Sequence, residues 1–317
     1  MFWDQFKAPF SILAPMEGVT DLVFRQVVAK AGRPDIFFTE FTNIYSYANQ
    51  LGRQNALERL QFLPSEQPIV AQIWGKTPEN FALMSAGLKD LGYQAVDINT
   101  GCPDKNVVAT GGGSALIRTP ELAAEIIQAT KSSGLAVSVK TRLGYSQVDE
   151  YQTWLPHLFK QDIQALTVHL RTKKEMSKVP AHFELIPAIV QMRNDLAPHT
   201  KLIINGDILD IQTGFQMAHE HGFDGVMIGR GVFHNPFCFT HHTPTQTELL
   251  ELLHYHLDLW ENYHYGQLAD RTPSMEPLKR FFKVYIHGVR GAHDLRAKLM
   301  DCHNLDQVRK VLKKENL

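Results

Sequence analysis

The chain has 317 residues, of which 44% are hydrophobic and 21% are charged, and its formal net charge at pH 7 is −1. This composition is typical of a soluble globular protein, and no apolar run approaches the roughly 20 residues that cross a bilayer. Three cysteines without CxxC spacing (Cys102, Cys238 and Cys302) exclude a disulfide framework and favour a reducing compartment, so we expect a cytoplasmic protein. The first residues also lack the basic flank and apolar core of a signal peptide.

Short β-rich apolar runs alternate with helical patterns along most of the chain. The runs are Ser11–Ala14, Ile36–Phe41, Ile69–Ile73, Ala95–Asn99, Ala136–Thr141, Ala165–Leu170, Leu202–Asn205 and Gly225–Ile228. The intervening helical stretches include Pro78–Leu91, Pro120–Ser132, Glu184–Arg193 and Asp210–His221. Alternating strands and helices predict a parallel sheet, and eight strands are the number that closes a (β/α)8 barrel, the TIM barrel. An open doubly wound sheet is the alternative, but no GxGxxG follows the first run, which counts against a dinucleotide fold.

The strand patterns end after Pro236. Leu249, Leu253, Leu257 and Trp260 then recur at helical spacing, so the rest of the chain reads as helices. We therefore expect a catalytic α/β barrel over residues 1–240, followed by a small all-helical C-terminal domain over residues 241–317.

Charge is spread unevenly between these two parts. Residues 271–317 hold 11 Lys or Arg against 5 Asp or Glu, whereas the remainder of the chain is net acidic. Such asymmetry indicates a basic appendix that meets a polyanion. An amphipathic helical bundle with a lysine-rich solvent face explains the charge count equally well.

Polar or charged groups follow nearly every predicted strand. In chain order the strand tips carry Pro15-Met16-Glu17, Thr39-Glu40, Gln72, Asn99 with Cys102, Lys140 with Arg142, His169 with Arg171, Asn205-Gly206-Asp207 and Gly229-Arg230-Gly231. Catalytic groups of such a barrel gather at the C-terminal ends of the strands. A purely structural barrel would need a buried partner for each of these groups. The whole set therefore predicts an active site at this end, with the Cys102 thiol on a loop beside the Asn99 amide.

The last two tips predict a phosphate site. Loops after strands seven and eight often hold ligand phosphates in these barrels. Gly206 and Gly229 let backbone N–H groups approach closely, and Arg230 adds a guanidinium. Two ordinary glycine turns are the alternative.

Lys140 ends an otherwise apolar strand, so its ammonium should point into the barrel mouth. It is either a Schiff-base lysine or a cation that faces an electron-rich ligand. Gln72, Asn99 and His169 would surround it with donors and acceptors, which suits a flat heteroaromatic ring better than an aldehyde. A phosphate beside a polar-edged ring describes flavin mononucleotide (FMN).

No metal site is expected. His219-Glu220-His221 lacks the i, i+4 spacing of a zinc helix, and His254-Tyr255-His256 has no third ligand nearby in the sequence. We expect both motifs to be surface histidines.

An ordered set of motifs resembles the tRNA-dihydrouridine synthases, a family of FMN-dependent enzymes. The matching segments are Leu13-Ala14-Pro15-Met16-Glu17-Gly18-Val19-Thr20-Asp21, Thr39-Glu40-Phe41, Gln72, Asp97-Ile98-Asn99-Thr100-Gly101-Cys102-Pro103, Gly111-Gly112-Gly113-Ser114-Ala115-Leu116, Val139-Lys140-Thr141-Arg142-Leu143-Gly144, Val168-His169, Asn205-Gly206-Asp207-Ile208 and Ile228-Gly229-Arg230-Gly231. They run in order across the predicted barrel. The family usually has His-Gly-Arg where this chain has His169-Leu170-Arg171, and the segment 173–180 also departs from the usual sequence.

The resemblance implies a role for each matching residue. The flavin would be contacted through the backbone by Pro15, Met16 and Glu17, and its ring edge by Gln72, Lys140 and His169. The ribityl chain and phosphate would be bound by Asn205, Gly206, Asp207, Gly229 and Arg230. The uracil would be positioned by Asn99, Arg142 and Arg171. Cys102 corresponds to the family's general acid.

The implied reaction reduces uridines of tRNA at the 5,6 double bond. Hydride passes from reduced FMN to C6, Cys102 protonates C5, and NADPH re-reduces the flavin. The basic C-terminal part would bind tRNA phosphates, with Lys279, Arg280 and Lys283 as candidates. The aromatic residues among them are either stacking platforms for bases or, as their helical spacing favours, core residues: Phe281, Phe282 and Tyr285.

Two other functions remain open. An FMN-dependent oxidoreductase of free pyrimidines, of the dihydroorotate type, would place similar residues in its barrel but would need no basic tail. A tRNA-binding or RNA-folding module would need the tail but not the intact Cys102, Lys140 and His169. Nothing in the sequence indicates a protein partner, so a monomer is the simplest expectation.

Overall fold

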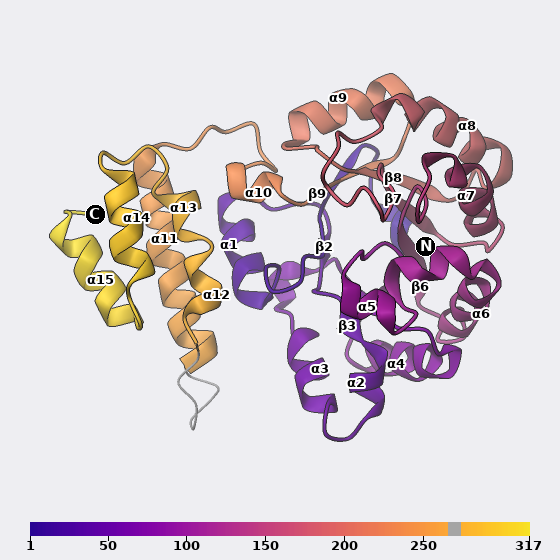
Figure 1. Cartoon of the computed structure of the whole chain (residues 1–317), viewed down its shortest axis with the longest axis horizontal. Coiled ribbons are helices and arrows are strands. Elements are labelled where there is room, and N and C mark those ends of the chain that lie inside the picture. Colours follow the sequence, from indigo (N-terminus) through magenta and orange to yellow (C-terminus); the bar gives the residue numbers. More distant parts are fainter. Residues whose placement is uncertain (266–273) are drawn as a thin grey trace.

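The computed structural model describes residues 1–265 and 274–317, and it forms a parallel barrel flanked by a helical region (Figure 1). The strands are β1 (Phe10–Leu13), β2 (Phe37–Phe38), β3 (Thr42–Asn43), β4 (Ile69–Trp74), β5 (Ala95–Asn99), β6 (Ala136–Arg142), β7 (Ala165–His169), β8 (Lys201–Asn205) and β9 (Gly225–Ile228). Their order in the sheet is β1-β9-β8-β7-β6-β5-β4-β2, with the short β3 also paired to β4. A parallel bridge between Ile12 and Ile36 brings the β2 end back to β1.

All eight predicted strand runs are confirmed as strands of this barrel within the described residues. The run predicted over Ile36–Phe41 is regular for only two residues, and the chain then pairs with β4 a second time through β3. The TIM-barrel prediction is therefore correct, and the open-sheet alternative is not.

Helices surround the barrel and build the C-terminal region. Their bounds are α1 (Leu22–Gly32), α2 (Ile44–Ala48), α3 (Arg53–Arg59), α4 (Pro78–Asp90), α5 (Lys105–Ala109), α6 (Pro120–Lys131), α7 (Tyr151–Phe159), α8 (Ile186–Leu196), α9 (Ile211–His221), α10 (Gly231–His234), α11 (Gln246–Trp260), α12 (Glu276–Lys279), α13 (Phe282–Tyr285), α14 (Ala292–Met300) and α15 (Leu305–Lys314). Short 3-10 turns lie at Phe2–Gln5, Pro64–Glu66, Gly113–Arg118, Val148–Glu150 and Phe183–Leu185, and a π-helical turn at Glu261–Tyr265 extends α11. Proline stands in the first turn of α4 and α6, and Gly222 ends α9 at φ 79°, a left-handed conformation that suits glycine.

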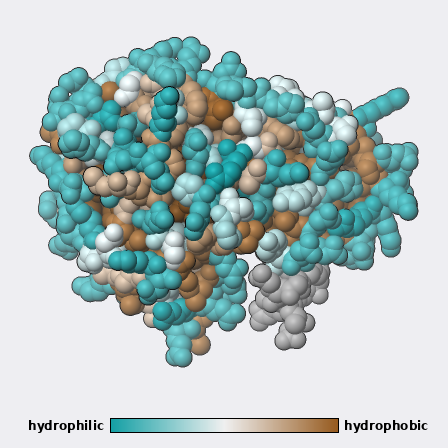
Figure 2. Space-filling model, turned by 180° about the vertical axis from the view of Figure 1, so that it is seen from behind, coloured by the Kyte–Doolittle hydropathy of each residue, from teal (hydrophilic) through white to brown (hydrophobic). Residues whose placement is uncertain are grey.

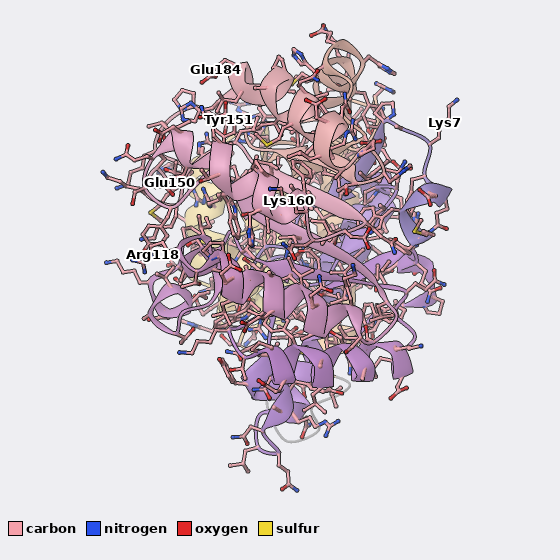
Figure 3. The ribbon with its side chains drawn as sticks, turned by 90° about the vertical axis from the view of Figure 1, so that its right-hand side faces the viewer. Lys7, Arg118, Glu150, Tyr151, Lys160 and Glu184 are labelled. Atoms are coloured by element: carbon pink, nitrogen blue, oxygen red, sulfur yellow. The ribbon has the colours of Figure 1, made fainter. Side chains whose placement is uncertain are left out.

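Strand alternation divides the apolar core into two. Val96, Ile98 and Val139 face the surrounding helices, while Ala95 and Ala136 belong to a second cluster inside the barrel. This inner cluster also contains Trp3 and Phe10, so the N-terminal 3-10 turn closes the barrel end where the strands begin. Polar side chains occupy the opposite end. Figure 3 marks that end by Arg118, Glu150 and Glu184, which lie along one edge of the view, whereas Lys7 lies at the other edge.

The helices α11–α15 pack beside α1 and α10 rather than over the mouth (Figure 1). Phe24 of α1 stacks on Phe281 with ring centroids 4.4 Å apart, and the Arg280 guanidinium donates to the carbonyl of Gly18 at 2.6 Å. Phe281, Phe282 and Tyr285 are buried, which confirms that they are core residues. The apolar core thus runs without a break from the barrel's outer layer into the helical region.

His256 corrects one expectation from the sequence. We expected a surface histidine, but its side chain is fully buried, and its Nδ1 lies 2.7 Å from the Tyr285 hydroxyl. The reason is that the apolar face of α11 turns His256 towards the stacked rings of Phe24 and Phe281. Helical spacing alone does not show which polar residue falls on such a face.

The surface seen from behind carries mostly hydrophilic residues over both the barrel and the helical region, with smaller hydrophobic areas between them (Figure 2). None of the described helices has the length and apolarity needed to cross a membrane. All three cysteines are free thiols.

Candidate active site

A cavity of about 520 Å³ opens where the barrel strands end. Most of the predicted site residues line it: Pro15, Met16, Gln72, Asn99, Cys102, Lys140, Arg142, His169, Asn205, Gly206, Asp207, Gly229 and Arg230. Its volume lies within the range of ordinary small-molecule sites, roughly 300–1,000 Å³. Seven strands or their loops therefore bring together side chains that lie more than 200 residues apart in the sequence.

A chain of hydrogen bonds crosses the floor of this cavity and ends at the cysteine loop. The Asp97 carboxylate accepts from the Ser138 hydroxyl and from Nε2 of Gln72, each at 2.7 Å. The side-chain carbonyl of Gln72 accepts from Nδ2 of Asn99 at 2.9 Å. The side-chain carbonyl of Asn99 then accepts the backbone N–H of Cys102 at 2.9 Å.

The Asp97 carboxylate sets the donor and acceptor direction of every hydrogen bond in this series. An ionised carboxylate only accepts hydrogen bonds, so Gln72 must turn its NH2 group towards Asp97 and its oxygen towards Asn99. Asn99 must then present its own NH2 group to Gln72, which leaves its oxygen for the N–H groups of Gly101 and Cys102. Burial raises the pKa of Asp97 to about 6, so the carboxyl group is still mostly ionised at neutral pH.

The Cys102 thiol is held on a braced loop at the edge of the cavity. Nε of Arg142 donates to the carbonyl of Gly101 at 2.7 Å, which ties the loop to the end of β6. Burial raises the pKa of the thiol above its usual value, with the neighbouring Asp104 acting in the same direction through its charge. The group is therefore a protonated thiol at neutral pH, which suits a proton donor.

Lys140 and His169 stand side by side on β6 and β7. Nζ of Lys140 donates to the side-chain oxygen of Asn205 at 3.0 Å. Burial, together with the charge of Arg142, lowers the pKa of Lys140 to about 8. Burial and the surrounding cations also hold the pKa of His169 well below its usual value, so the ring is neutral.

The tautomer of His169 follows from its neighbour. Nη1 of Arg171 lies 3.1 Å from Nε2 of His169. A guanidinium only donates, so Nε2 accepts and the ring proton is on Nδ1. The neutral imidazole of His169 thus lines the cavity together with the cations Lys140, Arg142 and Arg230.

The last two strand tips form the glycine-rich side of the cavity. Gly206 has φ 119°, and a Cβ there would approach Cδ2 of His169 to 3.1 Å, so only glycine suits this turn. The Asp207 carboxylate accepts from Arg230 at 2.7 Å, from the N–H of Ala181 at 3.0 Å and from Arg171. The Arg230 side chain remains 56% exposed and available to a second anion.

Some predicted residues lie outside this cavity. Arg171 is buried behind His169, and it donates to the carbonyl of Val179 and to Asp207 as well as to His169. Glu17 lines a neighbouring cavity and pairs with Arg59 at 2.7 Å. Their roles towards a ligand stay predictions.

The predicted RNA contacts on the helical region differ among themselves. Nζ of Lys279 pairs with Glu276 at 2.7 Å and its side chain is only 8% exposed. Arg280 is exposed but bonds to the carbonyl of Gly18, while Lys283 is exposed on α13. Lys283 is thus the most accessible of the three.

The sequence reading missed Asp97 and Ser138, which anchor the floor of the site. The signal was present, because residues two positions apart in a strand lie on the same face. Asp97 therefore shares the inward face of β5 with Ala95 and Asn99, and Ser138 shares that of β6 with Lys140. No group of three or more His, Cys, Asp or Glu side chains among the described residues could hold a metal ion.

Comparisons with known proteins place the whole chain in a family. A family profile described as dihydrouridine synthase (Dus) matches residues 12–317. The "Probable tRNA-dihydrouridine synthase" of Staphylococcus epidermidis is 54% identical over 313 residues, covering 98% of this chain and 95% of that protein. The "Probable tRNA-dihydrouridine synthase 2" of Bacillus subtilis is likewise 54% identical with the same coverage.

Solved structures at low identity support the fold alone. A histamine dehydrogenase from Rhizobium sp. 4-9 aligns with a TM-score of 0.52 at 11% identity, over 78% of this chain and 48% of that one. The 6-hydroxypseudooxynicotine amine oxidase of Pseudomonas geniculata N1 gives a TM-score of 0.52 at 12% identity, over 72% and 46%. Because the family profile covers nearly the whole chain and the curated relatives are more than half identical, this chain belongs to the dihydrouridine synthase family.

Proposed function

We propose that this protein reduces uridines in tRNA to 5,6-dihydrouridine, with FMN as its bound cofactor and NADPH as the reductant. The observation that carries the proposal is the cavity itself, in which one protonated thiol shares a single space with Lys140, a neutral His169 and two glycine-rich turns. Family membership supports the reaction, and the names of the relatives support tRNA as the substrate.

The residues of the cavity suit FMN. Lys140, Gln72 and the Nδ1–H of His169 offer a cation, an amide and a donor to the polar edge of a flat ring. Gly206, Gly229 and Arg230 offer close backbone approach and a guanidinium to a phosphate, although the Asp207 carboxylate must then face the ribityl hydroxyls rather than the phosphate. Pro15 and Met16 line the cavity next to Gly229.

FMN, when bound and reduced by NADPH, supplies hydride to C6 of uracil. The chain's own residues complete the reduction: Cys102 releases its proton to C5, where negative charge develops as C6 is reduced. Asn99 and Arg142 line the cavity beside the thiol, and their remaining donors would hydrogen bond to the uracil carbonyls and stabilise that charge. Solvent then restores the proton on Cys102.

The RNA must present its uracil at the barrel mouth. Removing the base from its stack costs roughly a few kcal/mol. The exposed Lys283 and its basic neighbours on the helical region would offset that cost through phosphate contacts.

Mapping dihydrouridine in tRNA from cells that lack the gene tests this function. We expect specific uridine positions to lose the modification and to regain it when the wild-type gene, but not Cys102→Ala, is restored. Unchanged dihydrouridine at every position in the deletion strain would refute the proposal.

A further inference from the structure

A second cavity, of about 550 Å³, adjoins the first one, and Cys102 and Phe41 line both. Its walls come from β3, α2, α3, α5 and the end of β4, and Glu17 is the lining residue outside the first cavity to which the resemblance gives a flavin contact. A ligand in this second cavity would therefore lie immediately beside the uracil that reaches the thiol.

The wall residues offer a flat ring both stacking and hydrogen bonds. The Phe41 and Trp74 rings lie 6.5 Å apart at 78°, and both line the cavity. Asn55 on α3 and Asn106 on α5 are exposed side-chain amides that line the cavity, and each can donate and accept. Aromatic faces with adjacent amides are the means by which proteins bind unstacked RNA bases.

A buried hydroxyl without a partner gives an independent sign of a ligand. Thr42 lines the cavity and is 1% exposed, yet its Oγ1 has no hydrogen-bond partner among the described residues. Buried polar groups in native proteins are nearly always paired with protein, water or a ligand, and among the unpartnered buried atoms of the described residues the Thr42 hydroxyl belongs to a residue that lines this cavity. A base edge in this cavity would pair with that hydroxyl.

The charges of the cavity favour a base over a phosphate. Arg59 is engaged by Glu17 at 2.7 Å and lies 3.9 Å from the carboxylate of Glu40. Glu17 and the exposed Asp104 add negative charge to the same walls. A phosphate or pyrophosphate would meet carboxylates here, whereas a neutral base would not.

We propose that this second cavity binds the nucleobase next to the target uridine in the RNA chain, and so helps to select which uridine reaches Cys102. The inference rests on the proposed function, because the neighbour is defined by the uridine that is reduced. Thr42 would bond to the base edge, Phe41 and Trp74 would contact its face, and Asn55 and Asn106 would close over it.

Three variants and one control test the cavity in the FMN-loaded protein. Thr42→Val removes the hydroxyl at constant shape, so the fold should keep or gain stability, whereas kcat/KM for tRNA should fall about tenfold. Asn55→Ala and Asn106→Ala should likewise lower kcat/KM for tRNA. Gln54→Ala is the matched control, since Gln54 is the exposed neighbour of Asn55 on α3 and does not line the cavity.

Modified RNAs make the test specific for a base. Synthetic tRNAs carry an abasic site either 5′ or 3′ of the target uridine, and reduction is measured with wild-type protein and with Thr42→Val. We expect one of the two abasic RNAs to lose about tenfold in kcat/KM with the wild type and to lose little further with Thr42→Val.

Each contrary result has a distinct meaning. Equal turnover of both abasic RNAs by the wild type would overturn the inference while leaving the proposed function intact. Variants that raise the KM for NADPH and leave that for tRNA unchanged would assign the cavity to the reductant and also overturn it. A wild-type protein that reduces no intact tRNA would overturn the proposed function and, with it, this inference.

Discussion

The side-chain oxygen of Asn99 accepts the backbone N–H of Cys102 at 2.9 Å, so an amide at the tip of β5 holds the start of the thiol's loop. That oxygen faces the loop only because Asp97, two residues earlier on the same strand, fixes the orientation of Gln72 and through it that of Asn99. The thiol is thus positioned from inside the barrel, where Asp97 and Gln72 are fully buried, rather than by the loop alone.

Asn99→Ala should lower kcat for tRNA reduction on the order of 100-fold, because Gly101 and Cys102 lose the acceptor of their N–H groups and the thiol moves. Affinity for FMN should change far less. Steady-state kinetics and flavin titration would measure both. Asn194→Ala, the same change at an exposed position of α8 that does not line the cavity, is the control.

A double variant separates positioning of the thiol from direct contact with the substrate. If Asn99 acts through Cys102, then Asn99→Ala should cost little more in a Cys102→Ala background. Full additivity of the two losses would mean that Asn99 acts on the substrate independently of the thiol.

Cys102→Ala should bind FMN as the wild type does but lose about 10²–10⁴-fold in the rate of tRNA reduction, because the proton donor is gone. Single-turnover oxidation of the reduced, tRNA-bound enzyme measures this rate directly. Cys302→Ala, a free thiol in the helical region, should leave the rate unchanged. Undiminished turnover by Cys102→Ala would show that Cys102 is not the proton donor.

FMN binding to the apoprotein should weaken at alkaline pH. Burial lowers the pKa of Lys140 to about 8, so its ammonium is charged below that pH and neutral above it. If the cation faces the electron-rich ring, affinity should be flat from pH 6.5 to about 7.5 and then fall by up to about tenfold per pH unit above 8. Fluorescence titration measures the affinity, and Lys140→Met should bind weakly without this dependence. A wild type whose affinity stays constant through pH 9 would exclude Lys140 from ring binding.

Much of this arrangement is predictable from sequence, and the limits have physical reasons. Each strand of the barrel is visible in the sequence as a short apolar run that ends in polar residues or glycine. Because the ends of the strands meet at one end of the barrel, Nζ of Lys140 lies 3.0 Å from the side-chain oxygen of Asn205. Period-2 alternation would also have identified Asp97 as an inward group. The orientation of helical side chains was not predictable, because His256 is buried against Phe24 and Tyr285, which lie far away in the chain. The second cavity lies between short elements that have no periodic signal.

tRNA binding should depend on salt and on the exposed cation of α13. Lys283→Ala should weaken binding and reduce the slope of log affinity against log salt by about 1, because one phosphate contact is lost. Lys279→Ala should leave the slope nearly unchanged, since that ammonium is buried beside Glu276. Filter binding at several salt concentrations measures the slopes. Equal slopes for Lys283→Ala and wild type would place the phosphate contacts elsewhere.

The most direct measurement is a single turnover of the purified protein, loaded with FMN and reduced by NADPH, on tRNA from cells that lack the gene. We predict that the flavin is reoxidised as tRNA is added, and that nucleoside mass spectrometry finds uridine converted to a product heavier by two hydrogens, at specific positions. Flavin that stays reduced in the presence of this tRNA, or that is reoxidised only by free pyrimidines, would contradict the account.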